Sequence, residues 1–176
     1  MNRQEIPLNS FNCNIIRMVD DGLLLTAGDF NTRSFNSMTI SWGSIGFIWG
    51  RPLAQVFVHP SRYTYEFMEK YDSFTITAIP GNRQGSILTV LGTKSGRNMD
   101  KINHSGLTPI PSVHIPSPTY EEAELTVECR KICHADFHAE AFAPYYREEM
   151  KSSTYHRAYL GEVVGIYGID KYRLDV

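Results

Sequence analysis

The sequence has few cysteines and no long apolar run. Its three cysteines are an odd number, and Cys13 lies far along the chain from Cys129 and Cys133. They offer no disulfide framework and agree with a reducing compartment. No run of about 18 apolar residues is present, and the first ten residues, MNRQEIPLNS, lack the apolar core of a signal peptide. We therefore expect a cytoplasmic protein that does not enter a membrane.

Charge of one sign is not in excess either. The 17 basic and 19 acidic residues give a net charge of -2, whereas a broad nucleic-acid surface normally needs a basic excess. We therefore expect no nucleic-acid partner. The 176 residues contain no repeat or composition break, so they predict a single domain spanning residues 1–176 with a core of its own. Residues 1–10 are polar and contain Pro7, which predicts an extended arm.

Several motifs of known chemistry are missing. The chain has no GxGxxG or Walker sequence and no nucleophile elbow, which excludes the usual Rossmann, P-loop and serine-hydrolase sites. The segment CRKICHADFH, residues 129–138, holds two cysteines and two histidines. On a strand, however, Cys129 and Cys133 lie about 13 Å apart and His134 points to the other face. Ordinary buried thiols are therefore a better interpretation than zinc or a Cys-His pair, and we expect no metal site.

The segment NSMTISWG, residues 36–43, carries the first functional pattern. With the period of two that a strand imposes, Met38, Ile40 and Trp42 share one face while Thr39 and Ser41 share the other. The first face is typical of a core, and the small hydroxyl side chains of the second are typical of a ligand site. Further strands are predicted at residues 14–18, 23–27, 53–58, 73–79, 123–136 and 161–167.

The segments between these strands predict helices and loops. Residues 61–71 have apolar positions at helical spacing, with Ser61 or Thr64 as the cap, and residues 83–91 form a second helical pattern. The segment SIGFIWGRP, residues 44–52, is rich in glycine and ends in proline, which predicts a loop. We expect its Phe47, Ile48 and Trp49 to pack against something outside the local strand, with a dimer partner as one candidate.

Two turns have the composition of a phosphate site. Such a site needs free backbone N–H groups, a hydroxyl and a cation, and both Pro60-Ser61-Arg62 and Lys94-Ser95-Gly96-Arg97 supply them. The alternative is that the serines merely cap helices and the basic side chains are solvated, and the residues alone leave both interpretations open. Tyr63, Tyr65 and Trp42 are candidates to stack on a planar ring, although such aromatic residues also serve as core or interface.

Taken together, four segments resemble the flavin reductase-like, flavoredoxin-like family. They are NSMTISWG, PSRYTYEF with its continuation FMEKYDSFTIT, GTKSGRNMDK and the late YLGEV strand, in the family's order from about Leu24 to Gly165. The resemblance implies a mainly β (α+β) fold, a Greek-key split β-barrel with a few short peripheral helices. It also implies bound FMN and a homodimer with the flavin near the subunit interface.

The resemblance also implies roles for particular residues, all of them cofactor-binding and none catalytic. The family's flavin-facing strand corresponds here to Asn36, Ser37, Met38, Thr39, Ile40, Ser41 and Trp42. The phosphate-side turn is similar to Ser61, Arg62, Tyr63 and Thr64, and the other wall of the site to Lys94, Ser95 and Gly96. The sequence departs from the family pattern at Gly22, Asn98 and Thr154, which concerns local contacts and the substrate more than the fold.

The implied activity is that of an FMN oxidoreductase, an NAD(P)H-dependent flavin reductase or a relative of one. Electrons would pass between the flavin and a small-molecule donor, such as a nicotinamide nucleotide, or a redox protein. A second hypothesis is a non-catalytic β-barrel that carries flavin or electrons without turnover. The sequence contains no nucleotide motif that distinguishes NADH from NADPH or identifies the physiological acceptor.

Overall fold

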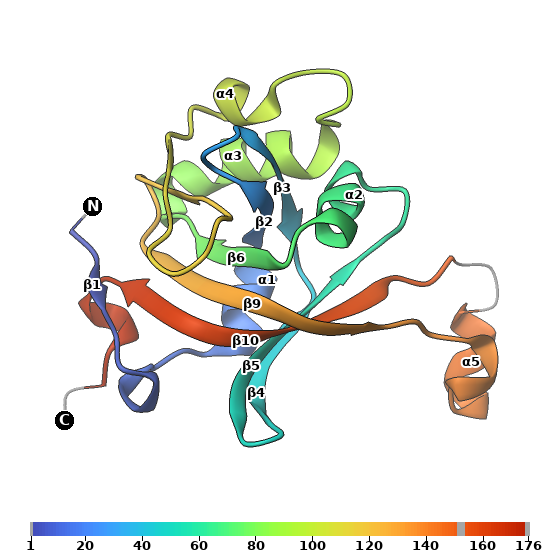
Figure 1. Ribbon diagram of the computed structural model, residues 1–176. Helices are drawn as coiled ribbons and strands as arrows, with labels where there is room; N and C mark the ends of the chain where they lie inside the picture. The colour runs from blue at the N-terminus through green and yellow to red at the C-terminus, as the bar shows by residue number, and fades with distance from the viewer. Residues whose placement is uncertain (1, 151–153, 175–176) are drawn as a thin grey trace.

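The computed structural model describes residues 2–150 and 154–174 and is built around one twisted antiparallel sheet (Figure 1). Its strands follow the order β3-β2-β6-β9-β10-β5-β4, with β1 paired to β10. The bounds are β1 Gln4–Glu5, β2 Leu23–Asp29, β3 Ser34–Ile40, β4 Gly43–Ile48, β5 Arg51–Val58, β6 Ser73–Ala78, β9 Leu125–Ala135 and β10 Arg157–Gly168. A separate pair joins β7 Pro109–Ile110 to β8 Thr119–Tyr120.

Short helices surround this sheet unevenly. Figure 1 shows α2, α3 and α4 gathered near β2 and β3, whereas α5 lies at the far end of β9 and β10. The bounds are α1 Ile15–Asp21, α2 Tyr63–Lys70, α3 Gly81–Thr93, α4 Lys101–Ser105 and α5 Pro144–Met150, with 3-10 turns at Leu8–Ser10, Ala139–Ala141 and Asp170–Tyr172. The helices near β3 are those that bring both predicted phosphate turns to one place.

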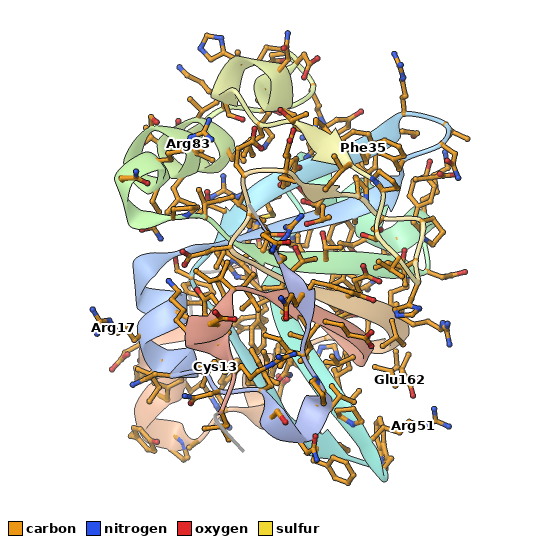
Figure 2. The ribbon with its side chains drawn as sticks, turned by 90° about the vertical axis from the view of Figure 1, so that its left-hand side faces the viewer. Cys13, Arg17, Phe35, Arg51, Arg83 and Glu162 are labelled. Carbon is orange, nitrogen blue, oxygen red and sulfur yellow. The ribbon has the colours of Figure 1, made fainter. Side chains whose placement is uncertain are left out.

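Two apolar clusters form the core, one on each face of β2. Leu25 belongs to the main cluster with Phe74 and Val127, whereas its neighbour Leu24 belongs to a second cluster with Ile87 of α3 and Tyr120. Burial on both faces explains why β2 has a continuous apolar run in place of alternation. At the opposite edge of the molecule, Arg51 of β5 forms a 2.6 Å ion pair with Glu162 of β10 (Figure 2).

The N-terminal segment is docked onto the sheet. Gln4 pairs with Gly168, and the residues that follow bond to the C-terminal segment through Asn12 N–H to Tyr172 O, at 2.9 Å, and Leu174 N–H to Ser10 O, at 2.8 Å. The predicted extended arm is therefore a short strand and a 3-10 turn. Residues near the two ends of the described chain lie side by side, as Figure 1 also shows.

Most predicted strands are confirmed, but the strand predicted at residues 14–18 and the loop predicted at residues 44–52 are wrong. Residues 14–18 fall at the start of α1, where the Asn14 side chain accepts the Arg17 N–H at 3.1 Å, in the manner of a helix cap. Residues 44–52 are not a loop but most of the β4–β5 hairpin, which turns at Trp49 and Gly50. Both turn residues have positive φ, as a two-residue hairpin requires, and Trp49 is an unusual residue for that conformation.

The predicted helices are present with different ends. Helix α2 has Arg62 as its N-cap without a side-chain hydrogen bond, so neither Ser61 nor Thr64 caps it. Their hydroxyl groups bond to His59 and Asn36 instead. Helix α3 extends beyond the predicted residues 83–91 at both ends, and α5 lies in a segment for which no helix is predicted.

Candidate functional site

The two predicted phosphate turns meet at one small cavity. It has a volume of about 120 Å³ and lies where the β5–α2 turn faces the C-terminal end of α3. Its lining consists of Met38, Ser61, Arg62, Tyr63, Thr64, Leu91, Thr93, Lys94, Ser95 and Lys101. Seven of the residues assigned to the cofactor from the sequence are thus brought together: Met38, Ser61–Thr64, Lys94 and Ser95.

Hydrogen bonds at its base hold the β5–α2 turn in place. His59 Nδ1 accepts the Ser61 backbone N–H at 3.1 Å and lies 2.7 Å from the Ser61 hydroxyl. Arg62 Nη1 donates to Gly92 O at 3.2 Å, which ties the turn to α3. The two turns that line the cavity are therefore fixed relative to each other.

Lys101 adds a buried positive charge that the sequence assignment missed. Its side chain is 4% exposed, and Nζ donates to the carbonyl oxygens of Leu91, at 3.0 Å, and Lys94, at 3.2 Å. Burial, and then repulsion by Arg62, lowers the pKa of Lys101 to about 8. An anion between these cations would offset both effects. Lys101 ends the KSGRNMDK segment, yet only its burial separates it from an ordinary solvated lysine.

Gly96 sits in a tight joint beside the cavity. A Cβ built on Gly96 would lie 2.9 Å from Tyr63 Cδ1 and closer still to Asn36 Oδ1. The Asn36 side chain is buried and donates to Thr64 Oγ1 at 2.7 Å. The predicted residues Asn36 and Gly96 therefore do not line this cavity; they hold β3, α2 and the 94–100 segment together and line a larger cavity next to it.

The other residues of β3 do not follow the predicted division into a core face and a ligand face. Met38, assigned to the core face, lines the cavity, whereas the Thr39 hydroxyl donates to Leu88 O of α3 at 2.9 Å. Ser37 is buried and lies 2.9 Å from the Thr26 hydroxyl, and Ile40 is part of the core. Ser41 lies beyond the end of β3 and is exposed, so its side chain is available to a ligand from outside.

Trp42 is also beyond β3, and it approaches the site through two histidines. Its side chain is 59% exposed, so the prediction that it belongs to the core is wrong. The Trp42 ring centroid is 4.6 Å from that of His156, which is 5.0 Å from that of His59. Burial, together with the charges of His59 and Arg62, lowers the pKa of His156. This aromatic row connects Trp42 to the Ser61 turn, and no local motif indicates that His156 joins it.

The Cys129–His138 segment lies elsewhere, on and after β9. Cys129 is fully buried in the main core, where burial and the nearby Glu128 raise the pKa of its thiol, so it is a poor nucleophile. Within residues 2–150 and 154–174, no three His, Cys, Asp or Glu side chains gather as a group that would hold a metal ion. None of the described helices is long and apolar enough to span a membrane.

The fold is similar to that of several solved flavoproteins. A FMN-binding domain of a flavin reductases-like enzyme from Shewanella baltica matches with a TM-score of 0.68 and 16% identity, over 95% of this chain and 77% of its own. The flavoredoxin of Desulfovibrio vulgaris (Miyazaki F) matches at 0.66 and 24%, over 85% and 70%. A structure from Shewanella frigidimarina that contains a split barrel domain matches at 0.67 and 16%, over 88% and 72%.

These matches confirm the predicted fold, a mainly β split barrel with short helices. The sequence also matches the flavin reductase like domain over residues 21–173, a range that contains most of the sheet and both turns of the cavity. The resemblance seen in the sequence is thereby confirmed. The chain belongs to the flavin reductase like domain family.

Proposed function

We propose that the chain binds FMN and works as an oxidoreductase of flavin reductase type, passing electrons between a nicotinamide nucleotide or a redox partner and the flavin. The observation that carries this proposal is the small cavity, where Lys101 and Arg62 face each other beside hydroxyl groups from both turns. Membership of the flavin reductase like domain family and the FMN-binding relatives support it.

The donors around the cavity fit the phosphate end of FMN. Phosphate oxygens accept strong charge-assisted hydrogen bonds, which Arg62, Lys94 and Lys101 are able to donate. Their positive charges would also balance the negative charge of the phosphate. Trp42 offers an aromatic face near the same turn, and the ring of Tyr63, with the Arg97 guanidinium 5.0 Å over its centroid, lines the cavity. When bound, FMN supplies the redox chemistry, and the side chains named here bind and orient it.

Two further parts of the proposal concern the setting of the protein. We place it in the cytoplasm, which its three free cysteines support. We also propose a homodimer, because Phe47 and Trp49 at the tip of the β4–β5 hairpin are 70% and 69% exposed. Large apolar side chains grouped in this way mark contact surfaces.

Binding is tested by titrating FMN into flavin-free protein while following flavin fluorescence and melting temperature. FMN should bind and raise the melting temperature, because a ligand of the native state stabilises it. Arg62→Ala should weaken binding by about 1.5 to 3 kcal/mol, or roughly 10- to 150-fold, since a charge-assisted contact is lost. Arg83→Ala, which removes an exposed arginine outside the cavity, is the matched control. Absence of FMN binding would refute the proposal.

Catalysis is tested separately from binding. The absorbance of the reduced nicotinamide follows the steady-state oxidation of NADH and of NADPH with added FMN. Turnover that depends on the protein, and falls in Arg62→Ala, is expected of a flavin reductase. Bound FMN without turnover with either donor would support the non-catalytic flavin or electron carrier instead.

A further inference from the structure

A second and larger cavity lies next to the first. It has a volume of about 970 Å³, within the size range of small-molecule sites, and it opens between the β2–β3 hairpin, α2 and α4. Phe35 of β3, which lines it, lies at the same end of the molecule as Arg83 of α3 and opposite Arg51 and Glu162 (Figure 2). This cavity is not used by the proposed phosphate contacts.

Aromatic side chains from three elements line the larger cavity. Phe30 comes from the hairpin, Phe35 from β3, and Tyr63 and Phe67 from α2. The rings of Tyr63 and Phe67 meet edge to face, with centroids 5.0 Å apart, so the two side chains on α2 pack against each other. Buried Leu107 provides further apolar surface. A wall of this kind suits a flat ring system such as a nucleobase.

Positive charge stands at the junction of the two cavities. Tyr63 and Lys101 line both of them, so these two residues separate one cavity from the other. Arg33 adds a second cation from the hairpin. The carboxylate of Asp100, which also lines the larger cavity, accepts the Asn103 N–H at 3.1 Å and caps α4. A ligand that bridges the cavities should therefore carry its phosphates at Lys101.

From this arrangement we propose that the larger cavity binds an adenosine monophosphate group, with its base against the aromatic wall and its phosphate toward Lys101. The proposal rests on the proposed function, because the small cavity then holds the phosphate of FMN. In FAD the FMN and adenosine monophosphate halves are joined by a pyrophosphate, which would fall at the shared lysine. A nicotinamide dinucleotide carries the same adenylate group and is the other source of it.

The test uses free AMP and FMN as probes, measured by calorimetric titration. AMP should bind flavin-free protein, with its base against the aromatic wall and its phosphate at Lys101. Asn103→Trp, at an exposed position that lines the larger cavity, should weaken AMP binding at least tenfold and leave FMN binding unchanged. Asn82→Trp, an exposed position of α3 that lines neither cavity, is the control. Phe30→Ala should weaken AMP at least threefold, and it serves as the second variant if Asn103→Trp melts early.

Two arms then identify the source of the adenylate group. If it is FAD, FAD should bind at least tenfold tighter than FMN and exclude AMP. If it is a nicotinamide dinucleotide, oxidised NAD or NADP should displace AMP from flavin-free protein. The inference is overturned, with the proposed function intact, if FMN binds but AMP does not, or if neither variant changes AMP binding. If the protein binds AMP but not FMN, and Asn103→Trp weakens the AMP binding, the proposed function is refuted and the adenylate site is not.

Discussion

Single residues set the charge of the small cavity, and Lys101 is the clearest case. Its folded-state pKa of about 8 lies below the ordinary value of 10.5 because the charge is buried and faces Arg62. Between these two values the unfolded chain binds more protons than the folded one at this site. The contribution of Lys101 to the free energy of unfolding therefore rises as pH increases from about 8 to 10.5.

We predict opposite pH trends for stability and FMN binding. Without FMN, wild-type protein should gain stability above pH 8 relative to Lys101→Met, by at most about 3.4 kcal/mol, since each pKa unit corresponds to about 1.4 kcal/mol. FMN affinity should fall above pH 8 as Lys101 loses its charge, and should fall less in Lys101→Met. Urea unfolding and FMN titration at matched pH values measure both trends. Parallel curves for the two proteins would contradict this assignment.

Gly96 provides a test of close packing beside the small cavity. In Gly96→Ala the new methyl group must displace Asn36 or Tyr63, which strains the Asn36–Thr64 hydrogen bond. We expect a loss of about 1 to 3 kcal/mol in the free energy of unfolding, together with weaker FMN binding. Gly85→Ala is the matched control, because a Cβ there meets nothing within 4 Å and Gly85 lies inside α3. That variant should gain up to about 1 kcal/mol. Equal effects in urea unfolding would rule out the steric explanation.

Among the elements, β9 holds residues 113–116, the segment that lies against the β2–β3 hairpin. Buried Glu128 accepts the N–H groups of Val113 and His114, both at 2.8 Å. The same segment bonds to the hairpin, where Phe30 N–H donates to Pro116 O at 2.9 Å. A strand in the middle of the sheet thus helps to position a wall of the larger cavity.

Glu128→Gln should destabilise the protein by about 1.5 to 3 kcal/mol, because the amide removes the charge and leaves one of the two N–H groups facing a donor. Hydrogen exchange should show faster exchange at Val113 and His114. Glu122→Gln is the control, since Glu122 makes a similar contact to Thr108 at a more exposed position. If the amides of Val113 and His114 keep their protection, Glu128 does not hold the segment.

Local patterns predict the elements better than the faces that those elements present. The alternation in NSMTISWG correctly predicts β3, yet its ligand face depends on which helix packs against each side. The Thr39 hydroxyl bonds to α3 and Met38 lines the cavity because of where α3 and α2 dock, and these contacts join residues far apart in the sequence. The β4–β5 hairpin is missed for a local reason, since Trp49 is a rare residue at a positive φ.

At the scale of the whole molecule, the proposed dimer depends on the tip of the β4–β5 hairpin. We predict that the wild-type protein sediments as a dimer at micromolar concentration. The double variant Phe47→Ser, Trp49→Ser should sediment as a monomer, because it removes two exposed apolar side chains. Its melting temperature should also become independent of protein concentration. The pair Val113→Ser, Tyr145→Ser, at exposed apolar positions outside the hairpin, is the control. A monomeric wild type would refute the proposed dimer.

The sequence predicts the family, most strands and the two turns that line the small cavity because each leaves a compact motif. It does not predict the Trp42–His156–His59 row, since His156 follows a segment outside the matching motifs and reaches Trp42 only in the folded sheet. The sequence also does not predict that two cavities meet at Lys101. Both depend on contacts between segments that lie far apart along the chain.

The position of β10 has a consequence for synthesis on the ribosome. This strand lies between β9 and β5, so among the described residues the β4–β5 hairpin joins the rest of the sheet through β10 alone. Residues 59–156 are translated after β5 and before β10, and throughout that time the pairing edge of β5 has no native neighbour. Nascent chains that stop before Arg157 should therefore bind chaperones or aggregate, and they should be degraded rapidly by cellular proteases.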